Sequence, residues 1–396
     1  MININQIIKE MDLDGDPSNH RVVVAMSGGV DSSVTAALLV EAGFEVVGLT
    51  MQLYDYGKAL QKKGACCAGS DINDARVVSS KLGIPHYVLN YESIFQNQVI
   101  NDFADSYLRG ETPIPCVRCN QTVKFTDMFD RAKNLGASAM ATGHYIRRKT
   151  KLGCPSLHTG IDPSKDQSYF LFATTKNQLK FVRFPLGSLT KNETRSVAKR
   201  HGLNVANKPD SQDICFVPEG NYAEVLRKLR PGSIEAGNII DVNGNVLGKH
   251  NGIIDFTIGQ RKGIGVGGRK DVDDNNSILY VISLDIEKNN VMVGPKEFLS
   301  CNKIKISDCN WLIDIKNITE FSVLVKLRNS SQPVIGTIKV NFDNSFAYLT
   351  FEKPQFGVST GQAAVFYNIK ESSHILGGGW ITEAPNKSAE IKLNNA

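Results

Sequence analysis

A glycine- and serine-rich segment, SGGVDSS at residues 27–33, lies between an apolar run typical of a buried strand and a helical pattern. Glycines let the backbone approach an anion closely, and a helix that follows offers unpaired N–H groups and the positive end of its dipole. Serine hydroxyls add donors, and Asp31 fits a role through Mg²⁺. The segment lacks the lysine of a Walker A loop, but it predicts a site for a phosphorylated ligand.

Three of the eight cysteines lie in polar segments whose composition suits sulfur chemistry. Cys116 and Cys119 form a CxxC pair within TPIPCVRCN, and Cys215 ends the polar run KPDSQDIC. A CxxC pair can be half of a metal site, a redox pair or a coincidence, and a thiol in a polar loop near cations can act as a nucleophile. The other cysteines fit no informative spacing and are expected to be structural or without a role: Cys66, Cys67, Cys154, Cys301 and Cys309.

Alternating strand and helix patterns surround these residues in the first part of the chain. Apolar runs at 21–26, 45–53, 86–90 and 138–145 are typical of strands, and helical patterns separate them. Strands separated by helices predict a parallel sheet with helices on both faces, in which ligands bind at the carboxyl ends of the strands. The loop at 27–33 directly follows the first strand, so we expect it at the ligand-binding edge.

The pattern changes after about residue 225, where turn signals such as Asn243-Gly244 separate short strand-like runs. From about residue 300 only short strands follow, which indicates a small antiparallel barrel or sandwich. The predicted fold class is α/β: a doubly wound, Rossmann-like parallel sheet, then a small central domain and a C-terminal antiparallel β-barrel. We expect a catalytic domain at 1–222, a central domain at 223–297 and a C-terminal barrel domain at 298–396.

The composition is that of a globular protein with two or three domains. The chain has 396 residues, of which 41% are hydrophobic and 21% are charged. The first residues lack the apolar run of a signal peptide and no stretch has the length of a membrane span, so we expect a cytoplasmic protein with no membrane partner. In that compartment a disulfide framework is not expected. The net charge of +5 permits a polyanionic partner without requiring one.

Beyond these patterns, the chain resembles the tRNA-specific 2-thiouridylases, which are PP-loop ATP pyrophosphatases. The resemblance extends over roughly residues 20–382 and is carried by segments that follow one another in the family's order. These segments are SGGVDSS, TPIPCVRCN, ATGHY at 141–145, KDQSYF at 165–170, DSQDICF at 210–216, TIGQRKG at 257–263 and TGQAAVFY at 360–367.

The resemblance implies ATP-dependent 2-thiolation of the wobble uridine (U34) of tRNA. The uracil 2-oxygen would be adenylated with release of diphosphate, and sulfur from a cysteine persulfide would give 2-thiouridine and AMP. Cys215 matches the persulfide carrier, and Cys119 matches the nucleophile that attacks the inner sulfur, leaving a disulfide that a reductant must reset. The implied partners are wobble-uridine tRNAs, such as those for Lys, Glu and Gln, and a persulfide donor such as a cysteine desulfurase or a sulfur-relay protein.

The family's binding residues carry over by position. The implied contacts to ATP, which is used with Mg²⁺, are Ala25, Met26, Ser27, Gly28, Gly29, Val30, Asp31, Ser32, Met51 and Gly143. The implied contacts to tRNA are Ile114, Pro115, Cys116, His144, Lys165, Asp166, Gln167, Arg328, Asn329 and Gln362. Of these, residues 114–116 match the segment that meets the target base, and no dedicated metal site is predicted.

Cys116 departs from the family's pattern, because many members have at that position an aspartate that is proposed to move protons. Cys116 could take that role only if its thiol ionised readily. Alternatively, Cys116, Cys119 and Cys215 could hold an iron–sulfur cluster with one open site. We favour a supporting role near the base, because the persulfide route needs only Cys119 and Cys215.

Several alternatives stay open at this point. His144 is also consistent with an ordinary strand-end histidine. The run YIRRKTK at 145–151 is either a solvated loop or a surface that contacts phosphates. An ATP pyrophosphatase acting on a small molecule would explain the loop but not Cys119, Cys215 or the β-rich final third. A non-catalytic, RNA-binding redox module that carries a cluster is the other alternative.

Overall fold

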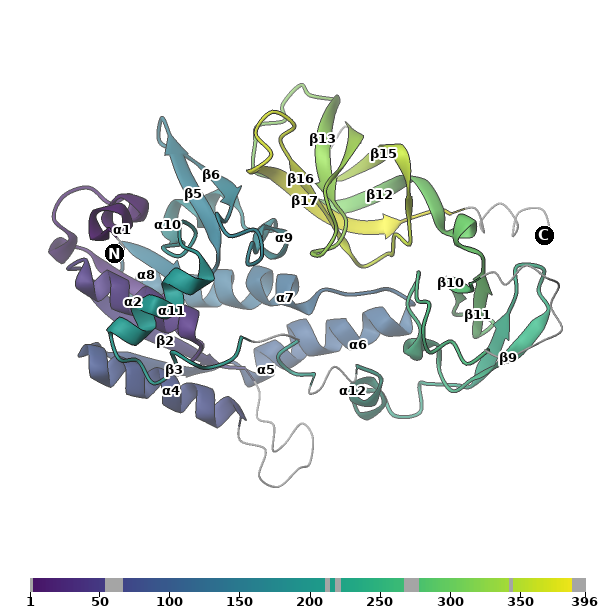
Figure 1. Cartoon of the computed structure of the whole chain (residues 1–396), viewed down its shortest axis with the longest axis horizontal. Helices are drawn as coiled ribbons and strands as arrows, with labels where there is room; N and C mark the ends of the chain where they lie inside the picture. Colours follow the sequence, from purple (N-terminus) through teal and green to yellow (C-terminus); the bar gives the residue numbers. More distant parts are fainter. Residues whose placement is uncertain are drawn as a thin grey trace. The chain divides into compact units, whose positions relative to one another are not determined.

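The computed structural model describes residues 3–53, 67–210, 214–217, 222–266, 278–341 and 345–386 (Figure 1). The chain forms two compact units, each with its own dense set of contacts. The first unit contains residues 1–100, 116–216 and 371–376, and the second contains residues 101–115, 217–370 and 377–396. Among the described residues, none of the helices has the length and the apolar character that a membrane span requires.

A five-stranded parallel sheet forms the centre of the first unit. In spatial order its strands are β3 (His86–Asn90), β2 (Glu45–Gln52), β1 (Arg21–Ala25), β4 (Ala139–Thr142) and β7 (Val182–Arg183). Val22 lies beside Val46 of β2 on one side and Ala139 of β4 on the other. The middle of β1 and all of β4 are buried, as expected for central strands that are covered on both faces.

Helices cover the two faces of this sheet. Val22 and Val24 point into a core cluster that they share with helices α1 (Ile4–Met11), α2 (Val30–Glu41), α4 (Cys67–Leu82) and α11 (Lys191–Arg200). The alternate residues Val23 and Met140 are also fully buried but lie outside that cluster, and α8 (Phe129–Asn134) contacts β4. Because successive side chains of a strand point to opposite faces, both faces are packed, which confirms the predicted doubly wound sheet.

Two stretches of the chain combine α-helical and π-helical turns, and a π-helix has i→i+5 hydrogen bonds. The first stretch is α5 (Glu92–Phe95), η2 (Gln96–Ile100) and α6 (Asn101–Leu108). The second is α7 (Pro115–Arg118), η3 (Cys119–Met128) and α8. Pro115 takes the first position of α7, where a missing N–H leaves no bond unmade. Shorter helices are α9 (Ser168–Leu171), α10 (Lys176–Phe181) and α12 (Tyr222–Leu229).

The basic run at 145–151 is part of a hairpin, so its interpretation as a solvated loop is wrong. β5 (Ile146–Lys151) pairs with β6 (Cys154–Thr159), and the first two residues of β17 (His374–Glu383) pair with β6. Arg148 donates to Asp12 at 2.6 Å, and Lys149 lies 3.2 Å from Glu371. The strand was not predicted because its side chains are mostly charged rather than alternating with apolar ones. In the structure, Arg148 and Lys149 are paired with acidic residues of the same chain.

The second unit contains two antiparallel hairpins in one four-stranded sheet, in the order β10-β11-β8-β9. Its strands are β8 (Gly237–Ile240), β9 (Val246–His250), β10 (Tyr280–Asp285) and β11 (Asn290–Gly294). The predicted turn at Asn243-Gly244 joins β8 to β9, and Gly244 has a φ of 87°. Asp241 accepts hydrogen bonds from the backbone N–H groups of Asn243 and Asn245, which closes that turn.

The C-terminal strands form a closed antiparallel barrel, which decides between the two architectures expected from the sequence. The strands are β12 (Ser300–Trp311), β13 (Glu320–Lys326), β14 (Val334–Val340), β15 (Phe346–Phe356), β16 (Ala363–Tyr367) and β17. They follow one another in the order β12-β15-β14-β13-β16-β17, and pairing of β12 with β17 closes the barrel. Side chains alternate between the interior and the surface, and Val323, Val325 and Ile338 fill the core.

Candidate active site

The glycine–serine segment joins β1 to α2 at the carboxyl edge of the parallel sheet. β1 has β2 on one side and β4 on the other, so the chain order reverses at this strand, and open α/β sheets bind ligands at such a point. Gly28 has a φ of 76°, and a Cβ atom on it would lie 2.0 Å from the backbone oxygen of Asp71. Only glycine fits there, and Gly29 caps the N-terminus of α2.

Hydrogen bonds within the loop use several of its own hydroxyl groups. The Ser27 N–H donates to Ser32 Oγ at 3.1 Å, and Ser33 Oγ donates to the Gly29 carbonyl at 2.8 Å. Ser32 and Ser33 therefore maintain the shape of the loop, whereas Ser27 is exposed. The Met26 side chain is buried, so contact of Met26 with a ligand would use its backbone.

Gly143 brings the end of β4 directly against this loop. A Cβ atom at Gly143 would lie 2.7 Å from the Ser32 nitrogen and 2.8 Å from the Asp31 carbonyl carbon. Met51, near the end of β2, belongs to the same carboxyl edge. The structure thus brings together the predicted nucleotide-binding residues from three neighbouring strands.

Asp31 is paired with a lysine that the sequence did not single out. Lys191 Nζ lies 2.7 and 2.9 Å from the two carboxylate oxygens, and the Tyr145 hydroxyl donates to Oδ1 at 2.8 Å. Burial, followed by the nearby Asp31 charge, raises the pKa of Tyr145, so the phenol stays protonated. Both oxygens thus have Lys191 as a partner in the described arrangement, and the role of Asp31 through Mg²⁺ stays a prediction.

Asp210 connects this ion pair to the segment that precedes Cys215. Its carboxylate lies 2.8 Å from the side-chain nitrogens of Lys165, Lys191 and Arg195. Burial alone would raise the pKa of Asp210, but hydrogen bonds from Lys165 and Lys191 outweigh it and lower the pKa to about 2. Asp210 is therefore ionised at every physiological pH.

Lys208 anchors the same segment to the nucleotide loop from a second side. Its Nζ lies 2.6 Å from Asp71 and 2.5 Å from Asp74, and it donates to the Gly28 carbonyl at 3.1 Å. Two ion-pair clusters thus fix residues 208–210 against the loop. The sequence offered a signal for this arrangement, because Lys208 and Asp210 flank a proline shortly before Cys215.

The structure brings the three cysteines of interest together in the first unit. Cys119 is the buried first residue of η3, Cys116 is exposed on α7, and Cys215 lies in a turn. Cys215 interacts electrostatically with both Cys119 and Cys116. Next to Cys215, the Phe216 ring packs edge-on against Phe95 at 5.7 Å between centroids, which fixes the end of this turn.

Both thiols that the resemblance assigns to catalysis are protonated in this arrangement. Burial raises the pKa of the Cys119 thiol, and Lys124 partly opposes that shift. Cys215 keeps solvent access as a residue, but protein packed around its sulfur, and then Cys119 and Cys116, raise its pKa to about 12. Lys124 opposes this shift as well. Lys124 was not predicted from the sequence.

His144 lies in the same neighbourhood as a neutral side chain. Burial, together with the charge of Lys124, lowers the pKa of His144 to about 3. Its Nδ1 lies 2.9 Å from Thr142 Oγ1, and its ring packs edge-on against Phe125 and Phe184. An imidazole with this pKa accepts a proton poorly at neutral pH, so His144 can bind or orient a partner but is a weak base.

The chain is similar to known proteins over most of its length. The chain matches the family model described as "tRNA methyl transferase HUP domain" over residues 20–219, the "tRNA methyl transferase PRC-barrel domain" over 224–295 and the "Aminomethyltransferase beta-barrel domain" over 301–381. It is 54% identical over 378 residues to the "tRNA-specific 2-thiouridylase MnmA" of Rhodospirillum centenum, with 95% of each chain covered. The chain belongs to the tRNA-specific 2-thiouridylase family.

Other members of the family are similarly close to this chain. The protein of that name from Cereibacter sphaeroides is 56% identical over 368 residues, covering 92% of this chain and 95% of the relative. The one from Parvibaculum lavamentivorans is 52% identical over 379 residues, covering 94% of each. The similarity thus includes both units.

In this chain, the segment at 165–167 uses its polar side chains within the protein. Asp166 accepts hydrogen bonds from the Gly160 N–H and the Ser168 hydroxyl, and Gln167 Oε1 accepts from the Tyr145 N–H at 2.9 Å. Lys165 is paired with Asp210. These predicted tRNA contacts therefore also shape the loop beside the nucleotide site.

The remaining predicted tRNA contacts belong to the second unit, apart from Cys116. Ile114 and Pro115 are buried, whereas Arg328 and Asn329 are exposed on the turn after β13. Arg328 donates to the backbone carbonyls of Gly357 and Ile258. Gln362 donates to the Thr112 carbonyl at 2.8 Å.

The cluster alternative for Cys116, Cys119 and Cys215 stays a prediction. Within the described ranges, no group of three or more His, Cys, Asp or Glu side chains is close enough to hold a metal ion. None of the described cysteines is in a disulfide, including Cys154, Cys301 and Cys309. Cys66 lies outside the described residues, as does the side chain of Cys67.

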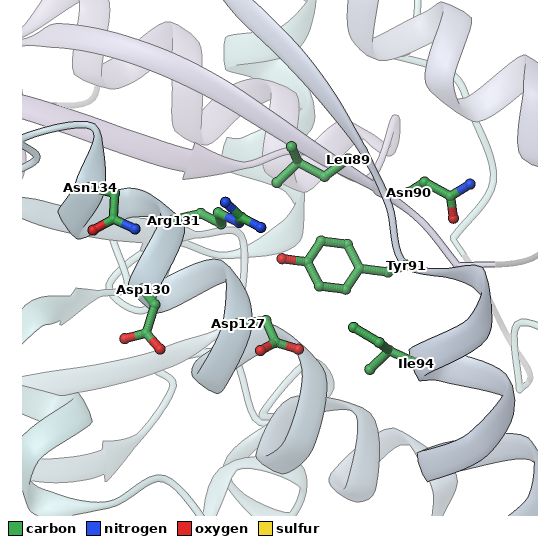
Figure 2. Close-up of a pocket in the computed structure, with 8 residues that line it drawn as sticks. All are labelled: Leu89, Asn90, Tyr91, Ile94, Asp127, Asp130, Arg131 and Asn134. Carbon is green, nitrogen blue, oxygen red and sulfur yellow. The ribbon is translucent and has the colours of Figure 1, made fainter.

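A pocket of about 410 Å³ lies elsewhere in the first unit, between the end of β3 and η3–α8 (Figure 2). The Tyr91 hydroxyl points toward Arg131, and a hydrogen bond from Arg131 partly offsets the burial that raises the pKa of Tyr91. Asp127 and Asp130 lie around the same hollow. The described lining of this pocket includes neither the three cysteines nor the glycine–serine loop.

Proposed function

We propose that this protein catalyses ATP-dependent 2-thiolation of the wobble uridine of tRNA. The observation that carries the proposal is the placement, within one unit, of the glycine–serine loop and of Cys119 and Cys215, which are far apart in the sequence. Its relatives of more than 50% identity are named tRNA-specific 2-thiouridylases. A small-molecule synthetase would use the loop but would leave the paired thiols without a role.

The first step would activate the uracil 2-oxygen, which is otherwise a very poor leaving group. The loop residues 25–32 would hold the ATP phosphates through backbone N–H groups and the N-terminus of α2, and Gly143 and Met51 would be further contacts to ATP. The uracil oxygen attacks the α-phosphate, and the bond between the α- and β-phosphates breaks. Diphosphate leaves, and the oxygen carries AMP.

The second step would transfer sulfur from a persulfide on Cys215. The Cys119 thiolate attacks the inner sulfur, the sulfur–sulfur bond breaks, and the outer sulfur leaves as hydrosulfide. Hydrosulfide adds to C2 of the activated uracil, and AMP leaves with the former 2-oxygen. The products are 2-thiouridine and a Cys119–Cys215 disulfide, which a dithiol reductant returns to two thiols.

Both thiols are protonated in this arrangement, so the reaction requires a step that deprotonates them. Thiolates are the reactive form of cysteine, and burial holds both thiols in the neutral form here. His144 is too weak a base to deprotonate them at neutral pH. We infer that deprotonation accompanies binding of substrate or donor, with Lys124 stabilising the thiolate that forms.

The partners in this proposal are a wobble-uridine tRNA, of the kinds that read Lys, Glu and Gln codons, and a persulfide donor protein. The test is mass spectrometry of the wobble nucleoside after incubation of the protein with tRNA, ATP and the donor, combined with measurement of diphosphate release. We expect the mass of the wobble nucleoside to increase by the difference between sulfur and oxygen. We also expect diphosphate to be released only when tRNA is present. Diphosphate release with an amine substrate but no change in tRNA would refute the proposal.

Variants of Cys119 and Cys215 separate ATP binding, sulfur acceptance and thiolation from one another. Cys119→Ser and Cys215→Ser should both lose thiolation while still binding ATP, because neither thiol belongs to the loop. Cys215→Ser alone should fail to accept labelled sulfur from the donor. Cys154→Ser, at an exposed thiol on β6, is the control and should behave as the wild type. A labelled and active Cys215→Ser protein would reverse the assignment.

A further inference from the structure

Gln362 holds a short piece of backbone that lies just before the CxxC pair in the chain. The Thr112 N–H donates to the Thr360 carbonyl at 2.8 Å, and Gln362 Nε2 donates to the Thr112 carbonyl at 2.8 Å. Both backbone polar groups of Thr112 are therefore bonded to the turn 360–362. All of these residues belong to the second unit.

Gly361 allows this close approach. It has a φ of 82°, and a Cβ atom there would lie 2.9 Å from Glu111 Cβ and 3.0 Å from the Thr112 nitrogen. The turn is itself fixed to β17, because Gly361 N–H donates to the Ile381 carbonyl at 2.9 Å and Ile381 N–H donates to the Gln362 carbonyl at 2.8 Å. A strand of the barrel thus supports the turn that holds Thr112.

The chain between Thr112 and Pro115 has few soft dihedral angles. It continues through Pro113, Ile114 and Pro115 into α7 and then η3, which carry Cys116 and Cys119. Proline fixes its own φ and restricts the residue before it, so few soft dihedral angles separate Thr112 from α7. A constraint on Thr112 is therefore passed along the chain to the segment expected to meet the target base.

We propose that Gln362 is a positioning residue, which binds the Thr112 carbonyl and so fixes the 112–115 segment in the protein without tRNA. The resemblance to the family assigns Gln362 a contact with tRNA, whereas its amide nitrogen donates to Thr112 here. The consequence for catalysis rests on the proposed function. The hydrogen bonds between Thr112 and the turn 360–362, called the clasp below, are a property of the tRNA-free protein. They can therefore be measured without any assay of thiolation.

The test is hydrogen–deuterium exchange of the full chain without tRNA, read on peptides that cover residues 108–116. Because two of the residues at 112–115 are prolines, only Thr112 and Ile114 contribute amide hydrogens there. Gln362→Met removes the donor, and loss of one net hydrogen bond predicts about fivefold faster exchange at Thr112. Gly361→Ala should have the same effect, because its Cβ displaces residues 111–112.

Asn329→Ala provides the matched control, because Asn329 is another predicted tRNA contact that is exposed and lies on a different turn. It should weaken tRNA binding and leave exchange at 108–116 unchanged. Gln362→Met should instead lower kcat with little change in the dissociation constant for tRNA. Wild-type exchange in both Gln362→Met and Gly361→Ala, with a loss of tRNA affinity only, would overturn the proposal.

Two further measurements keep the outcomes distinct. Both tryptophans, Trp311 and Trp380, lie in the second unit, so their fluorescence reports whether a variant barrel has folded. Gln362→Glu replaces Gln362→Met if the latter does not fold, because it keeps the shape of the side chain and removes the donor. If the wild type thiolates no tRNA, the proposed function fails, and the exchange data still decide whether the clasp exists.

Discussion

Replacing Asp210 with asparagine tests the ion-pair cluster that joins the nucleotide loop to the Cys215 segment. The substitution keeps the shape of the side chain but removes the charge shared by Lys165, Lys191 and Arg195. The carboxylate has a pKa of about 2 in the folded protein, against about 3.9 for a free side chain. A group with a lowered pKa stabilises the fold above the unfolded value and loses that contribution as the pH falls through the folded value.

The shift sets an upper bound of about 2.7 kcal/mol, at about 1.4 kcal/mol for each pKa unit. Partial exposure of the cluster screens these charges, so we expect a loss of about 1–2 kcal/mol in Asp210→Asn. This corresponds to about 5- to 30-fold faster exchange of the amides that open with α11, the helix that carries Lys191 and Arg195. The difference in exchange between Asp210→Asn and the wild type should be constant between pH 5 and 8, because this range lies above the unfolded pKa of about 4. It should shrink as the pH falls below about 4.

Hydrogen exchange of α11 peptides is the suitable assay, because both tryptophans are in the second unit and do not report on this helix. Asp14→Asn is the control, since Asp14 is an exposed carboxylate of the same unit. Raised salt should reduce the effect of Asp210→Asn by screening the ion pairs. If α11 exchanges in Asp210→Asn as it does in Asp14→Asn, the cluster does not stabilise this region and the reasoning fails.

Three further predictions concern the nucleotide loop and the thiols. Gly143→Ala should weaken ATP binding at least tenfold by pushing on the Ser32 nitrogen, and unchanged affinity in nucleotide titrations would contradict the described packing. Lys124→Met should raise the pKa of Cys119, seen as slower alkylation of that cysteine across a pH series, whereas Lys133→Met should not. Cys116→Ala should retain thiolation by iron-free protein supplied with a persulfide donor, and activity that appears only with bound iron would make the cysteines cluster ligands.

The parallel sheet, the two hairpins of the four-stranded sheet and the strands of the barrel were predictable because they depend on local patterns. The buried run at β1, the glycine loop after it and the turn at Asn243-Gly244 each have a short-range physical cause. The β5 strand was not recognised, because IRRKTK has no apolar alternation and its pairing with β6 is stabilised by tertiary contacts. The charged side chains of β5 gave no sequence pattern from which its backbone pairing with β6 could be predicted.

The positions of Lys124 and Lys191 could not be predicted from the sequence. Lys124 is five residues after Cys119, which in an α-helix of about 3.6 residues per turn would place it on a different face. The i→i+5 bonding of η3 widens the turn and brings these two positions toward the same face. Lys191 meets Asp31 only through packing of α11 against α2, a contact between distant segments.

The charge balance around the nucleotide loop bears on how ATP would be bound. Among the described residues, two lysines that are bonded to the loop are already neutralised: Lys191 by Asp31 and Asp210, and Lys208 by Asp71 and Asp74. An incoming triphosphate therefore finds the backbone N–H groups and the α2 N-terminus available at once, but must compete with carboxylates for either lysine. Both lysines are bonded to, or part of, residues 208–210, which lead to Cys215.

Nucleotide binding that recruits Lys191 or Lys208 would weaken the ion pairs that hold residues 208–210. We therefore expect ATP to increase amide hydrogen exchange in the segment that leads to Cys215 and to increase solvent access to the Cys215 thiol.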